Sequence, residues 1–296
     1  MRSVTVHAPA KINLSLHIVG KRADGFHILE SLVVFTDYGD EIQIIESDKL
    51  QLEIIGEFGK ELSSFSVEDN LVWKAALALQ KYSQKSLGAE IILTKNLPLA
   101  SGIGGGSADA AATIKALVKL WKLNIADEKL AEIALTLGSD VPVCLYGKPA
   151  IMSGVGEKIA PVTLQDNPYI VLINPNIPLA TAEVFQKFSS LRTEGEAIQK
   201  VRHTDKTGLL RYICNDEILE IYDKNDLESA AIAKLPIIGE ILTSLQSTQG
   251  CFMARMSGSG ATCFGLYHDE LSAKSAAYKL QKTYPQAWCM NTHIVH

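Results

Sequence analysis

The sequence has 296 residues, of which 47% are apolar and 21% charged, proportions typical of a folded globular chain and not of a disordered one. This length favours one or two domains over a larger array. Lys and Arg number 28 against 33 for Asp and Glu, so the net charge of −5 argues against a large nucleic-acid interface, and an anionic ligand would need a local positive site.

The cysteines and the apolar runs predict where the protein resides. The five cysteines include no Cys-x-x-Cys pair, and their odd number in a chain of this length indicates a reducing compartment, so a cytoplasmic protein is expected. The longest run without a charge, 167–182, is interrupted by prolines and is shorter than the ~18 to 20 apolar residues that cross a bilayer. The N-terminal segment alternates like a strand and carries Lys11 early, unlike a secretory signal. Neither a membrane span nor export is expected.

The N-terminal part of the chain is predicted to be mostly strands. Residues 12–18 alternate between apolar and mostly polar side chains, and residues 29–35 and 41–46 are rich in β-formers. Turn signals at 23–25 and 37–40 are expected to separate these strands. A helix over 71–82, capped by Asp69 or Asn70, and a strand over 89–94 follow.

The remainder of the chain mixes helices with strands. A glycine-rich loop over 98–106 leads into a helix over 107–122, and a second helix over 127–137 is expected to end at a left-handed Gly138, with an apolar strand after Asp140. Further strands are predicted at 169–173, 252–256 and 262–266, and helices at 181–188, 228–246 and 269–284. Without a regular βαβ period, this order predicts an α+β fold with a predominantly antiparallel sheet. Two lobes, 1–155 and 156–296, are expected to pack tightly and share a cleft.

The segment from Pro98 to Ala108 points most directly to a ligand. Its glycines let successive backbone N–H groups turn toward one point, and the helix that follows adds partial positive charge at its N-terminus, so a polyphosphate is the expected ligand. Ser107 could contact a phosphate oxygen or a metal ion bound to it. The segment matches neither a Walker loop nor a Gly-x-Gly-x-x-Gly loop. A strand-to-helix turn without a ligand is the alternative, although three consecutive glycines are entropically costly in such a turn.

Three further features carry an alternative each. The loop from Met256 to Thr262 is either a hairpin turn or a segment that closes over a transferred phosphate. Asp140 is either a turn or capping residue or a general base, and Lys11 is either a lysine that snorkels from a sheet edge or a cation beside that base. Together beside a polyphosphate, this lysine and aspartate would form a phosphoryl-transfer site. The histidines show no metal-ligand spacing, so no dedicated metal site is expected.

Three segments in order, Pro9–Leu14, Pro98–Ala108 and Ser257–Thr262, together resemble the GHMP kinase superfamily, named for galactokinase, homoserine, mevalonate and phosphomevalonate kinases. Within it, residues 21–27, 135–142 and 225–228 resemble the branch that acts on 4-diphosphocytidyl-2-C-methyl-D-erythritol in the non-mevalonate isoprenoid pathway. The resemblance implies a two-lobed α+β kinase fold. It also implies that ATP phosphorylates the 2-hydroxyl of that substrate, giving the 2-phosphate and ADP, with Mg²⁺ supplied with the nucleotide.

The resemblance also implies roles by position. Asp140 would be the general base and Lys11 its cationic partner. The implied ATP-binding residues are Asn70, Lys95, Pro98, Leu99, Ala100, Ser101, Gly102, Ile103, Gly104, Gly105, Gly106, Ser107 and Ala108, with Ser107 near the Mg²⁺ of the nucleotide. The implied substrate pocket comprises Asn13, Phe26, His27, Thr181 and Phe185, and the implied closing loop comprises Ser257, Gly258, Ser259 and Gly260. An aromatic face with polar groups at its edge suits a pyrimidine.

The sequence departs from the common family residues at three places, and two other functions stay open. Ala100-Ser101 stand where Gly-Ala or Gly-Gly is frequent, Phe26 where Tyr is frequent, and Ser257 where Thr is frequent. The expected partner is a small molecule with a cytidine diphosphate group, without nucleic acid, membrane or a required oligomer. The first alternative is a GHMP kinase of the homoserine or mevalonate type. The second is a catalytically silent nucleotide sensor on the same fold, which would not need both Lys11 and Asp140.

Overall fold

The computed structural model describes residues 2–23, 25, 27–191, 211–214, 217–220 and 224–295, so Phe26 lies outside the described residues. The chain divides into two compact units, the first made of residues 1–11, 38–99 and 104–147 and the second of 12–37, 100–103 and 148–296. The strands β1 (Ser3–Asn13) and β3 (His27–Ile45) each contribute residues to both units. The units therefore interleave along the sequence, whereas the expected lobes 1–155 and 156–296 divide it once.

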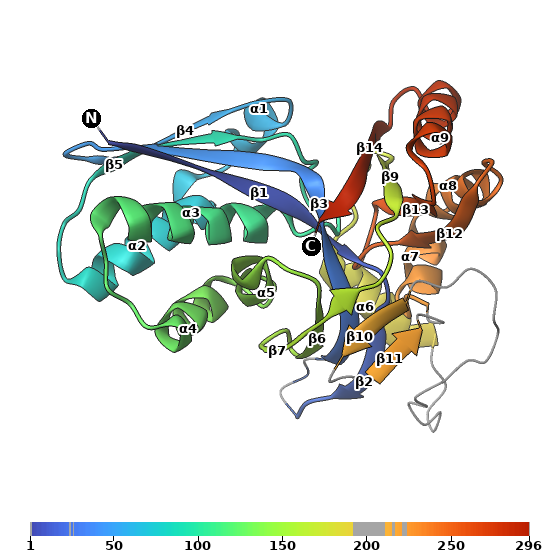
Figure 1. Ribbon diagram of the computed structural model, residues 1–296, viewed down its shortest axis with the longest axis horizontal. Helices are drawn as coiled ribbons and strands as arrows, with labels where there is room; N and C mark the ends of the chain where they lie inside the picture. Colours follow the sequence, from blue (N-terminus) through green and yellow to red (C-terminus); the bar gives the residue numbers. More distant parts are fainter. Residues whose placement is uncertain are drawn as a thin grey trace. The chain divides into compact units, whose positions relative to one another are not determined.

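In the first unit a sheet is covered by helices. Besides its parts of β1 and β3, this unit contains β4 (Leu50–Ile55), α1 (Gly59–Leu62), η1 (Val67–Asp69), α2 (Leu71–Ser83), β5 (Ala89–Thr94), α3 (Gly105–Trp121), α4 (Asp127–Leu137) and α5 (Val141–Tyr146). β5 pairs antiparallel with β3 and parallel with β4, and β1 also pairs with β3. Figure 1 shows α2 and α3 on one face of these strands, and both helices bury their apolar sides.

Several predicted elements of the first unit are confirmed, and one turn is wrong. The helix over 71–82 is α2, whose N-cap Asn70 accepts a hydrogen bond from the N–H of Val72 at 2.9 Å, and the strand over 89–94 is β5. The turn expected at 37–40 is instead the middle of β3. A side chain at Gly39 would lie 2.2 Å from the carbonyl oxygen of Ala8, so this glycine serves the close approach of β1 and not a turn.

Two further expectations around Asp140 are wrong. Gly138 ends α4 in an extended conformation, with φ of 165°, and not in a left-handed one. The apolar residues after Asp140 form the short helix α5, where Val141, Pro142, Val143 and Cys144 are buried. A proline in the first turn of a helix forfeits no hydrogen bond, because N–H groups there have no intrahelical partner, so Pro142 favours a helix start over a strand.

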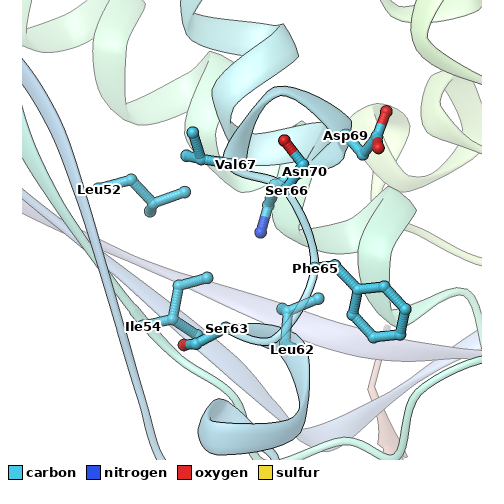
Figure 2. A pocket seen from close by; sticks show the side chains of 9 residues that line it. All are labelled: Leu52, Ile54, Leu62, Ser63, Phe65, Ser66, Val67, Asp69 and Asn70. Atoms are coloured by element: carbon cyan, nitrogen blue, oxygen red, sulfur yellow. The ribbon is translucent and has the colours of Figure 1, made fainter.

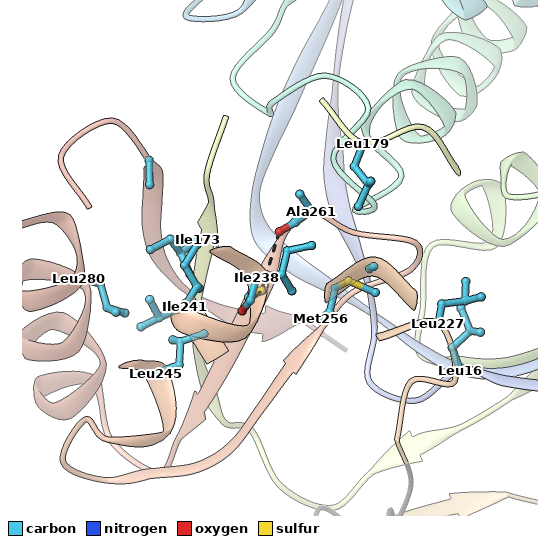
Figure 3. Packing of buried hydrophobic residues seen from close by; sticks show 14 of the residues in the cluster. Leu16, Ile173, Leu179, Leu227, Ile238, Ile241, Leu245, Met256, Ala261 and Leu280 are labelled. Carbon is cyan, nitrogen blue, oxygen red and sulfur yellow. Dashed lines mark hydrogen bonds between the residues drawn. The ribbon is translucent and has the colours of Figure 1, made fainter. Parts of the chain in front are cut away.

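The second unit has its own sheet and core. Besides its parts of β1 and β3, it contains β2 (His17–Lys21), β6 (Ala150–Gly154), β7 (Lys158–Pro161), β8 (Thr163–Leu164), β9 (Tyr169–Asn174), α6 (Thr181–Leu191), β10 (Arg211–Cys214), β11 (Glu217–Glu220), α7 (Glu228–Lys234), α8 (Ile237–Gln246), β12 (Cys251–Met256), β13 (Cys263–Tyr267), α9 (Glu270–Thr283) and β14 (Trp288–Val295). The order β12-β13-β9-β14 is antiparallel throughout, and α8 and α9 pack on these strands. Figure 3 shows the apolar cluster that they share, including Ile173, Ile241 and Leu280.

The predicted class of fold is confirmed, with one helix divided. β4 pairs parallel with β5, whereas β3 pairs antiparallel with β2, β5, β6 and β14, and the pairings within β6–β14 are antiparallel too, so the sheet is predominantly antiparallel. The helix expected over 228–246 is two helices, α7 and α8, because Pro236 cannot continue the first and stands at the N-cap of the second. Within the described part of the chain, no helix has the length and apolar character needed to cross a bilayer.

Candidate active site

Lys11 and Asp140 meet in the first unit. The Lys11 ammonium lies 2.8 Å from Oδ2 of Asp140 across 129 residues of sequence. β1 holds the lysine between the fully buried Ala10 and Ile12, and Asp140 stands at the start of α5, which the buried Val141 fixes in place. The lysine side chain is 3% exposed and that of Asp140 is 32% exposed, so the cation is enclosed and the carboxylate faces outward.

The second half of the glycine-rich loop reaches the same lysine. Gly104 has φ of +66° and precedes α3, and a side chain added there would lie 3.1 Å from Cβ of Lys11. The first N–H groups of a helix have no intrahelical acceptor, and no side chain caps α3 at Gly104. The N–H groups of the first turn, together with the helix dipole, therefore form a region suited to an anion close to Lys11.

Lys95, expected near the nucleotide, directs its ammonium into the protein. The side chain is 2% exposed and donates to the Asp40 carboxylate and, at 2.8 Å, to that of Asp109, the fifth residue of α3. Burial lowers the pKa of Lys95, but the two carboxylates outweigh it, so the pKa is raised. Burial also raises the pKa of the Asp109 carboxyl more than Lys95 lowers it, and Asp40 adds to the rise. Asp40 also accepts the N–H of Leu97 at 2.9 Å, and a side chain on Gly105 would begin 3.0 Å from the Lys95 ammonium, so this buried Lys-Asp-Asp cluster packs against both ends of the glycine-rich loop.

A pocket of about 390 Å³ lies beside α2. It is lined by the apolar residues Leu52, Ile54, Leu62, Phe65 and Val67 and by the polar residues Ser63, Ser66, Asp69 and Asn70. In Figure 2 the amide nitrogen of Asn70 points into this pocket, while its oxygen caps α2. Leu71, the next residue, lies 3.6 Å from where a side chain on Gly106 would begin. The pocket thus combines apolar walls with one inward donor, close to the glycine-rich loop.

In the second unit, the first half of the glycine-rich loop is bonded to the loop 257–260. The hydroxyl of Ser257 donates to the carbonyl of Gly102 at 3.0 Å, and the N–H of Thr262 donates to the carbonyl of Ser101 at 3.1 Å. Gly102 has φ of +76°, and a side chain there would lie 2.5 Å from the carbonyl oxygen of Ser257. Within this unit, the loop 257–260 is therefore a fixed support of the glycine-rich loop. It also forms the turn of the hairpin between β12 and β13.

Most of the predicted substrate residues form two groups in the second unit, both built on α6. His27 stacks on Phe185 with ring centroids 5.0 Å apart and an angle of 25°, and Phe188 meets His27 edge-on. One turn earlier on α6, the hydroxyl of Thr181 lies 2.8 Å from that of Ser259. Helical spacing of four places Thr181 and Phe185 on one face of α6. An aromatic surface with hydroxyls nearby results.

Asn13 is held by several partners. Its side-chain amide donates to the hydroxyl of Ser31 at 2.7 Å, and its backbone N–H donates to the hydroxyl of Ser257 at 3.0 Å. The sequence reading missed Ser31, and it also missed Asp40, Asp109 and Phe188. Asp109 had a detectable signal, since it directly follows the segment Pro98–Ala108, whereas the others depend on strand and helix pairings that local patterns do not reveal.

A metal ion fits this site only in company with a phosphate ligand. Among the residues that the structure describes, no three His, Cys, Asp or Glu side chains gather as a metal centre. The half-buried hydroxyl of Ser107 in the first turn of α3 is an oxygen ligand of the kind that Mg²⁺ takes. A Mg²⁺ ion there would draw its remaining ligands from phosphate oxygens and water.

Two protein-family models match the chain. The model described as GHMP kinases N terminal domain covers residues 70–148, and the one described as GHMP kinases C terminal covers residues 206–286. The chain is also similar to a homoserine kinase structure from Cytophaga hutchinsonii, with a TM-score of 0.67 and 20% identity over 99% of this chain and 95% of that one, a likeness that concerns the fold alone.

Closer similarity extends along the whole chain. A 4-diphosphocytidyl-2-C-methyl-D-erythritol kinase from Paramagnetospirillum magneticum is 42% identical over 97% of both chains. The enzyme of the same name from Parvibaculum lavamentivorans is 45% identical over 96% of both. A crystal structure of 4-(cytidine 5'-diphospho)-2C-methyl-D-erythritol kinase has a TM-score of 0.75 and 28% identity, covering 99% of this chain and 100% of that one. Through this full-length similarity, the chain belongs to the GHMP kinases and, within them, to the family of the 4-diphosphocytidyl-2-C-methyl-D-erythritol kinases.

Proposed function

We propose that this chain transfers the γ-phosphoryl group of ATP to the 2-hydroxyl of 4-diphosphocytidyl-2-C-methyl-D-erythritol, giving the 2-phosphate and ADP. The observation that carries the proposal is the 2.8 Å pair of Lys11 and Asp140, with Gly104 packed against the lysine stem. A phosphoryl-transfer site needs a carboxylate that can accept the proton of the attacking hydroxyl, beside a group of donors for the phosphates. Both requirements meet here within one compact unit.

Each partner of the pair has its own task in the proposed reaction. The partly exposed carboxylate of Asp140 accepts the proton as the hydroxyl oxygen bonds to the γ-phosphorus, and the bond from that phosphorus to the bridging oxygen of ADP breaks. The buried ammonium of Lys11 orients this carboxylate and balances its charge. The proton then leaves Asp140 for solvent, since that side chain is 32% exposed.

The glycine-rich loop and the pocket beside α2 would bind ATP. The N–H groups at the start of α3 would bind the phosphates, and Mg²⁺ carried with them would offset their charge beside Ser107. The pocket of about 390 Å³ is large enough for a nucleobase, and the inward amide of Asn70 would donate to a ring nitrogen. In this proposal Lys95 supports the loop through Asp40 and Asp109, because its ammonium is already bonded to them.

The cytidine group would bind to residues of the second unit. Phe185 offers an aromatic face to a base, and His27 and Thr181 offer polar atoms for its edge or for the ribose. Asn13, whose amide nitrogen is bonded to Ser31, would line the same pocket. The role of Phe26 and the cytoplasmic location both stay predictions from the sequence.

A panel of acceptors with γ-labelled ATP tests the proposal. The first acceptor is 4-diphosphocytidyl-2-C-methyl-D-erythritol. The others are methylerythritol phosphate, which lacks the cytidine group, homoserine and mevalonate. Transfer of label to the first alone is expected. Transfer to homoserine or mevalonate at a comparable rate would assign the chain to another GHMP activity. Binding of ATP without transfer to any acceptor would favour the nucleotide sensor.

A further inference from the structure

The segment from Asn225 to Glu228 has no part in the proposed chemistry, yet each of its three polar side chains forms hydrogen bonds with backbone groups. Asn225 is 3% exposed. Its amide nitrogen donates to the carbonyls of Met256 at 2.9 Å and Gly258 at 2.7 Å, and its oxygen accepts the N–H of Leu227 at 2.9 Å. An amide that spans two carbonyls of one turn fixes the shape of that turn, because both bonds must be made at once.

The flanking carboxylates of the segment tie the same region to its surroundings. Glu228 accepts the N–H of Met256 at 3.0 Å, and Asp226 accepts the N–H of Ile18 at 2.9 Å. Leu227 and Met256 also belong to the apolar cluster of the second unit that Figure 3 shows. The segment is thus anchored in the core and holds the loop 257–260 from one side.

From this loop, the hydrogen bonds continue to the glycine-rich loop and to β1. Ser257 lies between the two carbonyls that Asn225 binds, and its hydroxyl both donates to the carbonyl of Gly102 and accepts the N–H of Asn13, each at 3.0 Å. A side chain on Gly258 would lie 2.7 Å from the carbonyl oxygen of Gly102, so the two loops are in close backbone contact. A shift of the turn would therefore move Gly102 and Asn13 together.

We propose that Asn225 is a positioning residue, which sets the first half of the glycine-rich loop for ATP by fixing the turn at Ser257. The inference rests on the proposed function, in which this loop binds the phosphates. Catalytic groups must be held to within about 0.5 Å, and a displacement of about 1 Å can cost two orders of magnitude in rate. In this proposal Asn225 acts only through the turn and does not contact the reacting atoms.

The test compares Asn225→Ala with Tyr267→Phe. The control also removes a buried hydrogen bond in the second unit, since the hydroxyl of Tyr267 lies 2.6 Å from that of Thr248, but it does not touch either loop. Both variants are expected to lose stability to chemical denaturation, Asn225→Ala more than Tyr267→Phe, because it removes three hydrogen bonds and the control removes one. Asn225→Ala is expected to raise KM for ATP about tenfold, and Tyr267→Phe is expected to leave it unchanged. Hydrogen exchange measured by mass spectrometry should rise in residues 98–106 of Asn225→Ala alone.

The double variant Asn225→Ala/Ser257→Ala tests the route. If Asn225 acts through Ser257, the double variant should raise KM for ATP no further than the more severe single variant. If instead the fold-changes in KM of the two single variants multiply in the double variant, Asn225 does not act through this turn. The inference would be overturned if Asn225→Ala had the KM for ATP and the exchange pattern of Tyr267→Phe while the wild-type chain still transferred phosphate. Should Asn225→Ala fail to fold, Asn225→Ser, with a shorter side chain and one donor, is measured in its place. An inactive wild-type chain would instead contradict the proposed function.

Discussion

At the scale of single residues, the pair of Lys11 and Asp140 is defined by unequal burial. The side chain of Lys11 is 3% exposed, so its ammonium has lost most of its hydration and needs the carboxylate at 2.8 Å as compensation. Asp140 keeps access to solvent and can change partners or protonation. In the proposed reaction this asymmetry separates the roles: the lysine would orient the carboxylate, and the aspartate would exchange a proton with a ligand.

Asp140→Asn is expected to lower kcat by about 10² to 10⁴, the range for removal of a general base, with a smaller effect on the affinity for ATP. The carboxamide keeps the shape of the side chain but cannot accept the proton. Steady-state kinetics of phosphate transfer, with a binding titration of ATP, measure both quantities. A variant that retained kcat would show that Asp140 is not the base.

Lys11→Met provides the companion to this measurement. Methionine retains an unbranched apolar stem and removes the charge, which leaves Asp140 without its partner. If the two residues act as one unit, Lys11→Met/Asp140→Asn should be about as slow as the slower single variant. Additive losses in ln kcat would mean that the lysine acts on the phosphates and not on Asp140.

At the scale of elements, the glycines of the loop differ in what surrounds them. Gly102 has no room for a side chain, because the carbonyls of Ser257 and Gly260 lie 2.5 and 2.7 Å from its would-be Cβ. At Gly106, in the first turn of α3, the nearest atom is Cδ1 of Leu71 at 3.6 Å, an ordinary contact. The fold therefore requires glycine at position 102 and does not require it at position 106.

Gly106→Ala should consequently separate binding from folding. Alanine within a helix is favoured over glycine by about 0.5 to 1 kcal/mol, so the unfolding free energy should stay constant or increase. If phosphate approaches the first turn of α3, the added methyl group should raise KM for ATP about tenfold. Chemical denaturation and kinetics measure the two effects. The matched variant Gly102→Ala should instead lose stability, and an unaltered KM in Gly106→Ala would place the phosphates elsewhere.

Some elements follow from local sequence patterns and others do not. The helix α2 and the strand β5 follow from periodicity and from the cap at Asn70, all of which are local signals. The turn expected at 37–40 fails because Gly39 is required by a strand 31 residues earlier, which approaches it at Ala8. Long-range packing therefore requires a glycine at this position, and no local pattern distinguishes it from a turn residue.

At the scale of the whole molecule, the sequence motifs identify the central residues of the candidate site but not the residues that support them. The resemblance supplies Lys11, Asp140 and the glycine-rich loop, and the structure joins the first two at 2.8 Å. The supporting residues escape such a reading. Asp40 meets Lys95 across 55 residues of sequence and Asn225 meets Met256 across 31, so their partners appear only when the chain is folded.

The buried cluster of Lys95, Asp40 and Asp109 should make the stability of the molecule depend on pH. Burial raises the pKa of Asp109 in the folded protein to about 8, so the folded state holds this proton more tightly than the unfolded state does. The resulting contribution to stability is fully present below the ordinary pKa of an aspartate, about 4. It is lost as the pH rises through the folded-state value, because the unfolded state then binds fewer protons than the folded one.

Asp109→Asn isolates this contribution, because its carboxamide cannot ionise and leaves Lys95 paired with Asp40 alone. The unfolding free energy of the variant relative to wild type should therefore increase between about pH 4 and about pH 8 and level off above that. Denaturant unfolding across this range, followed by circular dichroism, measures the difference. Asp37→Asn, at an exposed position of β3 outside the cluster, is the matched control for the replacement of a carboxylate by a carboxamide. A flat difference for Asp109→Asn would mean that Asp109 is ionised throughout, with its charge fully balanced by Lys95.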